Sequence, residues 1–325
     1  MQNPRLTIIV PCYNEEAVLP KSAHILDGIL TDLIQHKQVN AASKLLFVDD
    51  GSQDKTWKLI KSLEKQYSTV TGLKFSRNFG HQNALMAGMQ VASPTAEIVI
   101  TIDADLQDDP DKIEDMVAKH LAGADIVYGV RNDRQTDTAF KRGTAGMFYG
   151  LMNRLGVQMI PNSADFRLLS QRAVKTLLSF PEENLFLRAM VPLVGYPSTT
   201  VAYARLPRPA GESKYPLKKM LSFAFDGITS FSIEPIRLVM DIGFLFVFIG
   251  IAAFIYSLVQ HGRGRVVPGW TSMFCSLWII GGALMIAISV LGEYIGKIYT
   301  EVKRRPRFII EEDTVTPSEK ETQKK

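Results

Sequence analysis

Five aspartates crowd into the stretch TIDADLQDDP and the position that follows it. Asp103 and Asp105 come directly after an apolar run, and their i and i+2 spacing places both carboxylates on one side of an extended chain. Hard divalent cations such as Mg²⁺ take oxygen ligands, commonly one or two carboxylates together with phosphate oxygens. Asp108 and Asp109 are expected only to turn the chain and cap a helix that begins at Pro110. The stretch therefore predicts a cation site beside a helix start, against the simpler alternative of a solvated capping loop.

The surrounding residues alternate between short apolar runs and helical patterns. Strands are predicted over residues 6–10, 44–49, 71–75, 97–103 and 125–130, and helices over 17–35, 54–67, 83–92 and 110–123. This alternation is typical of an α/β fold, in which helices flank a mostly parallel sheet. Ligands bind such sheets beyond the carboxyl ends of the strands.

Polar clusters follow the first four predicted strands, and Arg131 follows the fifth. The clusters read PCYNEE (11–16), DDGSQD (49–54), SRNFGHQN (76–83) and DADLQDD (103–109). We expect all of them to converge on one edge of the sheet. This convergence is a more specific signal than an isolated Asp-x-Asp motif.

Several other classes of site are disfavoured. The chain has no G-x-G-x-x-G motif after its first strand and no Walker A sequence, which argues against a Rossmann dehydrogenase and a P-loop nucleotidase. Its five histidines show no metal-ligand spacing. Cys12 and Cys275 are distant in the sequence, one in a predicted loop and the other in an apolar segment, so a disulfide framework is not expected. The net charge of +4 alone neither favours nor disfavours nucleic acid, and no nucleic-acid partner is expected.

Two uncharged segments follow the α/β region, at residues 242–259 and 270–292. A helix crosses a bilayer core with about 20 apolar residues, so these segments predict a transmembrane hairpin rather than buried core helices. Basic residues are more numerous in the flanks of the hairpin than in the connecting loop 261–269. The positive-inside rule therefore places the large domain and both termini in the cytoplasm of a multi-pass membrane protein.

Four regions result from this division. Residues 1–215 are expected to form the large cytoplasmic α/β domain, 216–235 a juxtamembrane amphipathic helix on the bilayer surface, 236–296 the hairpin, and 297–325 a cytoplasmic basic strand and tail that is partly disordered. The polar tail after Arg307, EEDTVTPSEKETQKK, is expected to be disordered.

Taken together, the motifs resemble a known family. PCYNEE, VDDGSQDKT, SRNFGHQNALMAG, TIDADLQDDP, YGVRNDR, SADFRLLS and AGESKYPLKKM are similar to family 2 glycosyltransferases that charge polyisoprenyl phosphates. That group includes dolichyl-phosphate mannose synthases and bacterial undecaprenyl-phosphate glucosyltransferases. The resemblance runs from about Leu6 to Arg307, and LGEYIGKIYTEVKRRPRF resembles the bacterial branch that ends in two transmembrane helices.

The resemblance implies a GT-A fold, Mg²⁺ or Mn²⁺, and a UDP-sugar donor, with UDP-glucose as the first choice and other UDP-sugars open. It also implies a polyprenyl phosphate acceptor, the bacterial plasma membrane, and a homotetramer as one possible assembly. The metal ligands would be Asp103, Asp105 and Gln107. Nucleotide-sugar binding would fall to Pro11, Tyr13, Asn14, Glu15, Asp50, Arg77 and Asp103.

Catalytic roles are expected for Asp105, Asp165 and Arg131, where Asp165 could either position the substrates or act as a base. The acceptor phosphate would meet Arg131, Lys141 and Arg142, because guanidinium and ammonium groups suit phosphate oxygens. The resemblance of GESKY (211–215) to the family's loop near the acceptor adds Ser213 and Lys214 to these contacts. For Lys141 and Arg142 the alternative is an ordinary surface charge.

The predicted reaction is a metal-dependent inverting transfer of one sugar to undecaprenyl phosphate. A processive polysaccharide synthase is the second hypothesis, and it is weakened because the chain lacks a Gln-x-x-Arg-Trp motif and further spans. A membrane-tethered nucleotide-sugar binding protein without turnover is the third.

Overall fold

The computed structural model describes residues 3–132, 160–204 and 270–315, together with single positions between 236 and 245. It divides into two units. The first contains Met1–Tyr149, Gln158–Lys214 and Arg305–Lys325, and the second contains Gly150–Val157 and Tyr215–Arg304.

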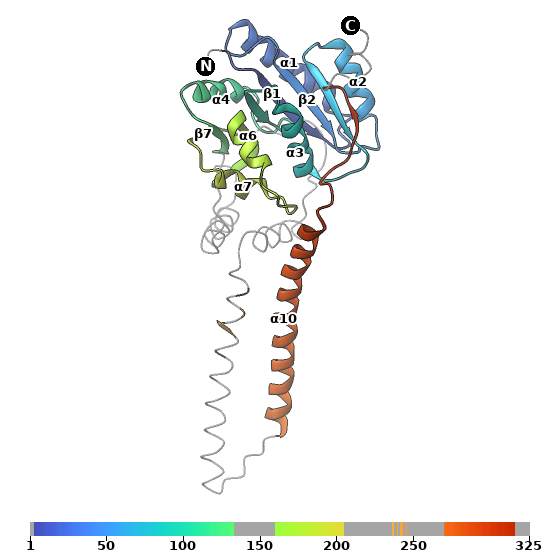
Figure 1. Ribbon diagram of the computed structural model, residues 1–325, viewed down its shortest axis with the longest axis vertical. Helices are drawn as coiled ribbons and strands as arrows, with labels where there is room; N and C mark the ends of the chain where they lie inside the picture. Colours follow the sequence, from blue (N-terminus) through green and yellow to red (C-terminus); the bar gives the residue numbers. More distant parts are fainter. Residues whose placement is uncertain are drawn as a thin grey trace. The chain divides into compact units, whose positions relative to one another are not determined.

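The first unit is built on a mixed sheet. Its described strands are β1 (Leu6–Cys12), β2 (Lys44–Asp49), β3 (Val70–Phe75), β4 (Ile98–Thr101), β5 (Ile126–Arg131), β6 (Ser163–Ser170), β7 (Ser198–Tyr203) and β8 (Ile310–Asp313). They lie in the order β7-β5-β6-β4-β1-β2-β3-β8 (Figure 1). β6 is antiparallel to β4 and β5, β8 is antiparallel to β3, and the remaining pairs are parallel. The predicted α/β class with a mostly parallel sheet is confirmed.

Helices cover both faces of this sheet. They are α1 (Leu19–Gln35), α2 (Thr56–Gln66), α3 (His81–Ala92), α4 (Lys112–Leu121), α6 (Gln171–Leu178) and α7 (Leu187–Leu193). Alternate residues of β1, such as Ile8 and Val10, join α1, α2 and α4 in one hydrophobic cluster. Ile9 points to the opposite face, where Gly88 of α3 packs on it so closely that a Cβ at Gly88 would lie 2.4 Å from its side chain. The period-2 alternation of a strand thus separates the two layers.

The predicted strands and helices of the first 131 residues are all present, with shifts at their ends. β2 has the predicted bounds. The helix expected from Pro110 begins instead at Lys112, because Asp109 Oδ1 accepts the Asp111 amide at 3.1 Å in a turn before the helix. β4 ends at Thr101, and Asp103 lies in a turn in which its carbonyl accepts the Leu106 amide at 3.1 Å.

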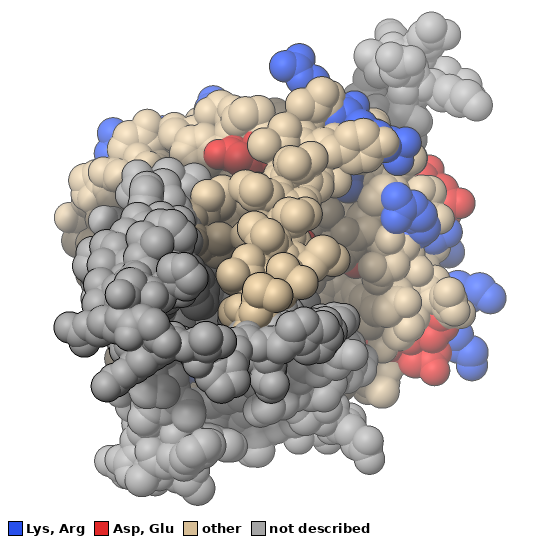
Figure 2. All heavy atoms as spheres, turned by 90° about the horizontal axis from the view of Figure 1, so that it is seen from below, with Lys and Arg blue, Asp and Glu red and all other residues tan. Residues whose placement is uncertain are grey.

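Residues 310–313 were expected to lie in a disordered tail, and that expectation is wrong. They form β8 on the outer edge of the sheet, where β3 offers an unpaired row of backbone groups. Glu311 pairs with Lys74 at 2.7 Å, and Glu312 pairs with Lys61. The acidic residues that suggested disorder therefore meet lysines that are distant in the sequence. Figure 2 likewise shows basic and acidic side chains side by side along one border of the described surface.

The second unit contains α10 (Trp270–Lys303), a helix of 34 residues. Its segment Ala283–Lys303 is the one helix of the described residues that is long and apolar enough to cross a membrane, and this is weak evidence by itself. Large side chains such as Leu277, Leu284 and Ile288 are exposed along it. The predicted span 270–292 lies in this helix. The predicted juxtamembrane helix 216–235, the loop 261–269 and most of the first span lie outside the described residues.

Candidate active site at the carboxyl edge of the sheet

The loops after β1 and β2 are joined by reciprocal hydrogen bonds. The backbone amide of Asn14 donates to Ser52 Oγ at 2.9 Å, and the backbone amide of Gln53 donates to Asn14 Oδ1 at 2.9 Å. The Glu15 amide donates to Thr56 Oγ1 at 2.9 Å. Asn14 has a φ of 54°, in the left-handed region that asparagine tolerates better than most residues. Two of the four predicted loops therefore form one rigid border of the site.

Asp50 joins the loop after β3 to this border. Its side chain is buried, and its carboxylate accepts the Phe79 amide at 2.7 Å and the Gly80 amide at 2.9 Å. Burial raises the pKa of Asp50, while these two amides act in the opposite direction. Asp50 was predicted to lie near the base or ribose of a nucleotide. In the structure it anchors the third loop, and its contact with a nucleotide stays a prediction.

Gly51 holds the same two loops in close contact. Its φ is +66°, and an added Cβ would lie 2.2 Å from the Arg77 carbonyl carbon, which belongs to the backbone and cannot rotate away. We expect Gly51→Ala to lower the melting temperature by roughly 5 °C or more and to weaken nucleotide binding, because strain of about 1–2 kcal/mol adds to this clash. Thermal unfolding followed by circular dichroism measures the first effect.

Gly123→Ala is the matched control for that substitution. Gly123 also has a positive φ, of +111°, but no heavy atom lies within 4 Å of its added Cβ. It should show the conformational strain without the clash. Equal losses for the two variants would contradict the proposed packing between the loops.

The other residues predicted to bind nucleotide lie around this border. Tyr13 is exposed, whereas Pro11 is buried in β1. The Arg77 guanidinium lies 3.8 Å from the centre of the Phe79 ring, and its Nη1 donates to the Asn78 carbonyl at 3.0 Å. The structure brings Tyr13, Asn14 and Arg77 to the predicted edge, and their contact with a nucleotide stays a prediction.

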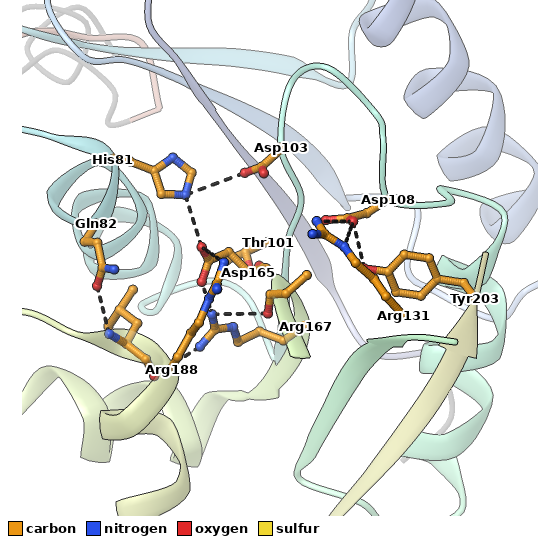
Figure 3. A network of polar contacts seen from close by, with 12 residues as sticks. His81, Gln82, Thr101, Asp103, Asp108, Arg131, Asp165, Arg167, Arg188 and Tyr203 are labelled. Carbon is orange, nitrogen blue, oxygen red and sulfur yellow. Dashed lines mark hydrogen bonds and ion pairs between the residues drawn. The ribbon is translucent and has the colours of Figure 1, made fainter. Parts of the chain in front are cut away.

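His81, the first residue of α3, connects the third loop to the fourth (Figure 3). Its Nε2 lies 3.5 Å from Asp103 Oδ1 and 3.7 Å from Asp165 Oδ2. Desolvation lowers the pKa of His81, but attraction to Asp165 and Asp103 outweighs it, so the pKa is raised. The sequence singled out no role for His81 beyond structure or orientation. Its place between two acidic residues from different strands is visible only in the fold.

Asp165 is surrounded by cationic groups (Figure 3). Arg167, itself almost fully buried, forms an ion pair with Asp165 Oδ1, and Arg188 Nη2 lies 3.3 Å from Oδ2. Burial raises the pKa of Asp165, but Arg188, His81 and Arg167 together hold it well below its usual range. A carboxylate with so low a pKa is a weak base. Of the two roles left open for Asp165, its geometry favours positioning.

Arg167 is fixed by its backbone partners as well. Its Nη1 donates to the Leu187 carbonyl at 3.2 Å, and the Leu187 amide donates to Gln82 Oε1 at 2.8 Å. Thr101 Oγ1 at the end of β4 donates to the Asp165 carbonyl. The start of α7, the start of α3 and strand β6 are thus held together beneath Asp165.

Asp103 and Asp105 have the donor chemistry of a cation site. The pKa of Asp103 is raised to about 6, mainly by removal from water and to a smaller extent by Asp165, Asp108 and Asp105, while the charge of His81 acts in the opposite direction. Leu106 between the predicted ligands has a φ of 45°, which is strained for a leucine and characteristic of functional loops. Gln107 is buried, and its backbone amide donates to Asp105 Oδ1 at 3.3 Å.

A divalent cation would relieve the repulsion between these carboxylates, so their chemistry is suited to binding a divalent cation. Within the described ranges, no three His, Cys, Asp or Glu side chains form a group that could hold a metal alone. Any cation would therefore need ligands beyond these carboxylates, such as the phosphate oxygens that Mg²⁺ commonly takes.

The contacts of Asp108 show that the prediction that it only turns the chain is wrong. It is buried, and its Oδ1 accepts from Arg131 Nε at 2.9 Å, from Arg131 Nη2 at 2.7 Å and from the Tyr203 hydroxyl at 2.7 Å (Figure 3). These bonds tie the fourth loop to the ends of β5 and β7. Arg131, which was predicted to meet the acceptor phosphate, is thus engaged by Asp108 in this structure. The strand-end position of Arg131 was visible in the sequence, but its partner was not.

The remaining predicted acceptor residues, Lys141, Arg142, Ser213 and Lys214, lie outside the described residues. The four strand-end clusters and Arg131 are linked by the contacts above. The predicted convergence is confirmed as geometry.

Known proteins are similar to this sequence over most of its length. The sequence pattern of "Glycosyl transferase family 2" matches residues 7–178. A Bacillus subtilis protein named as the uncharacterized glycosyltransferase YkoT is 51% identical over 95% of this chain and 92% of its own length. The SfII prophage-derived bactoprenol glucosyl transferase of Shigella flexneri is 39% identical over 94% of this chain and 97% of its own length. Mannosyl-3-phosphoglycerate synthase from Rubrobacter xylanophilus, a solved structure, has a TM-score of 0.46 at 14% identity and covers 83% of this chain and 80% of its own.

Proposed function

The chain belongs to glycosyl transferase family 2 and is a glycosyltransferase, and from that premise we propose that it moves one sugar, glucose, from a UDP-sugar to undecaprenyl phosphate. The observation that carries this proposal is the 39% identity to a bactoprenol glucosyl transferase over 94% of the chain. Similarity of that extent reaches beyond the family pattern at residues 7–178 into the C-terminal apolar region. The sequence similarity therefore covers the C-terminal apolar region as well as the residues of the sheet.

The proposed reaction is a single displacement with inversion. An oxygen of the acceptor phosphate attacks the anomeric carbon, and the bond to the UDP oxygen breaks, leaving its electron pair on the diphosphate. The acceptor phosphate is largely ionised near neutral pH, so it needs no strong base. This agrees with Asp165, which its cationic neighbours keep ionised and which we assign to positioning.

Asp103, Asp105 and Gln107 would hold Mg²⁺ or Mn²⁺ together with the donor diphosphate. A bound divalent cation supplies stabilisation of the negative charge that develops on the departing diphosphate. The chain contributes the rest of the arrangement. Asp108 fixes the loop through Arg131 and Tyr203, and His81 holds Asp103 beside Asp165.

Removal of divalent cations should stop the reaction. We expect a chelator to reduce sugar transfer by at least about a hundredfold, because the charge on the leaving diphosphate is uncompensated without a cation. Excess Mg²⁺ or Mn²⁺ should restore the transfer. Initial rates in purified, detergent-solubilised protein measure this. Full activity after exhaustive chelation, with metal content checked by mass spectrometry, would remove the cation from the proposal.

The order of the strands supports an even number of membrane crossings. α10 precedes β8, and β8 pairs with β3 in the same sheet, so the chain on both sides of the apolar region returns to one compartment. If α10 crosses the bilayer, a second crossing is therefore needed between residues 204 and 270. We propose a two-helix hairpin at 236–296 with the catalytic domain and both termini on the cytoplasmic face of the bacterial plasma membrane.

Membranes that contain the full chain test the whole proposal. They are incubated with radiolabelled UDP-glucose, undecaprenyl phosphate and Mg²⁺, and the organic phase is analysed for an acid-labile lipid that carries one glucose. A parallel set of UDP-sugars identifies the donor. A long polymer would favour a processive synthase, and donor binding without any transfer would favour a binding protein. Chemical cross-linking of the same membranes tests the homotetramer that the family resemblance implies as one possible assembly.

A further inference from the structure

The segment of residues 307–314, here called the C-terminal segment, is bound to the catalytic domain along its whole length. The Ser76 amide donates to the Ile309 carbonyl at 3.1 Å, and the Thr314 amide donates to the Gly72 carbonyl at 3.0 Å. Between these bonds, β8 runs antiparallel to β3. The pairing brings residues near position 310 to the chain that leads into the third loop of the site.

Side chains anchor both ends of the C-terminal segment. Trp57 Nε1 of α2 donates to Glu312 Oε1 at 3.0 Å. Arg307 Nη2 donates to the Phe180 carbonyl at 2.6 Å. The segment is therefore held at the outer edge of the sheet and also at the chain that follows α6.

A row of aromatic rings runs from this segment to the candidate active site. Phe308 stacks on Phe75, with ring centres 5.3 Å apart and planes 8° apart. Phe75 meets Phe79 edge to face at 5.6 Å. The Arg77 guanidinium lies over the Phe79 ring, 3.8 Å from its centre. Contacts of this kind are specific in geometry as well as apolar.

Protection of a sheet edge is the simpler explanation for β8. It accounts for the backbone pairing and for the lysine–glutamate pairs. It does not account for Phe308, which precedes the strand and is stacked on Phe75, the last residue of β3. The next residue, Ser76, is bonded directly to Ile309, and Phe79 and Gly80 donate to Asp50. The loop of residues 76–80 is thus fixed from two sides, by Asp50 and by the C-terminal segment.

We propose that Phe308 is a positioning residue for the donor site, acting through Phe75 and Phe79 to hold Arg77 and the 76–80 loop in their binding geometry. The inference rests on the proposed function, because it assigns this loop to the nucleotide of the donor. The donor site would then depend on a segment that follows the apolar helix in the sequence, as well as on residues of the sheet and its loops. The ligand assigned to the 76–80 loop is the nucleoside diphosphate group of the donor.

Phe308→Ala in the full-length protein tests the inference. We expect the KM for UDP-glucose to rise by about threefold to tenfold, the effect of one aromatic pair, with kcat nearly unchanged. Hydrogen exchange at the Phe79 and Gly80 amides should accelerate by a similar factor of about three to ten, because the loop opens more often. Phe308→Tyr keeps the ring and should restore both values.

Ile309→Ala is the matched control, since Ile309 is the adjacent residue, has an exposed side chain and contributes only its backbone carbonyl to the loop. It should leave KM and amide exchange unchanged. Unchanged exchange in Phe308→Ala, or equal effects in both variants, would overturn the inference. If the wild type binds no UDP-sugar, the proposed function fails, and the assignment of the loop to the donor fails with it. If the wild type binds UDP-sugar normally and Phe308→Ala has the wild-type KM and amide exchange, only the inference is refuted.

Discussion

The Asp105→Ala variant is expected to lose sugar transfer by about a hundredfold to a thousandfold while keeping the wild-type fold. Asp105 lies in the loop after β4, between Asp103 and Gln107 in the sequence, and the backbone amide of Gln107 donates to its Oδ1 at 3.3 Å. Its removal takes away one of the two carboxylates proposed to hold the cation against the diphosphate. The measurement is the initial rate of formation of the glucose-labelled lipid at saturating Mg²⁺. Circular dichroism checks that the fold is retained.

Asp109→Ala provides the matched comparison. Asp109 lies in the same acidic stretch, but its Oδ1 accepts the Asp111 amide at the start of α4 and it is not a proposed ligand. This variant should transfer sugar at the wild-type rate and lose at most about 1 kcal/mol of stability, the value of a helix-start hydrogen bond. Full activity in Asp105→Ala, or equal losses in both variants, would refute the assignment of the cation site.

The Asp165→Asn variant is expected to lose about 3–5 kcal/mol of unfolding free energy, together with most of its activity. Arg167 is 2% exposed and pairs with Asp165, so removal of the carboxylate charge leaves a buried guanidinium without its counter-ion. The exposed pair between Lys112 and Asp115 gives the control, because Asp115→Asn should cost less than about 1 kcal/mol. Denaturant unfolding of each variant measures both values.

The same carboxylate sets part of the pH dependence of stability. Because the folded-state pKa of Asp165 lies well below its unfolded value of about 3.9, its contribution is fully present above that value and is lost as the pH falls through the folded pKa. The difference in stability between wild type and Asp165→Asn should therefore shrink as the pH falls below about 4, and it should also shrink as the pH rises through the raised pKa of His81, whose cationic form Asp165 stabilises. A difference that keeps growing below about pH 4 would contradict the assignment.

The parts of the fold that were predicted correctly have local signals. β2 has its predicted bounds because the apolar run KLLFVD ends at the turn residues DDGS. The meeting of the first four loops follows from the parallel order of their strands, which brings successive carboxyl ends to one edge. Asp103 therefore lies beside His81 although 22 residues separate them in the sequence.

The parts that were missed depend on partners far away in the sequence. Nothing near Asp108 indicates that it will meet Tyr203, which lies 95 residues further along. SADFRLLS was noticed as a motif, but its insertion as β6, antiparallel between β4 and β5, has no local signature. The acidic residues of β8 look disordered by composition, and only the exposed edge of β3 makes them a strand.

The pairing of β8 with β3 also sets an order on how the protein is made. The Gly72 amide donates to Thr314 Oγ1, a residue 242 positions later, whereas every other described strand of the sheet is complete by residue 203. Since domains fold from the N-terminus during synthesis, the ribosome must first deliver α10 before this edge can close. Until then the nascent chain has an open strand edge at β3, and the 76–80 loop is held by Asp50 without the C-terminal segment. The proposed support of this loop by Phe308 is therefore added only after α10 has been synthesised.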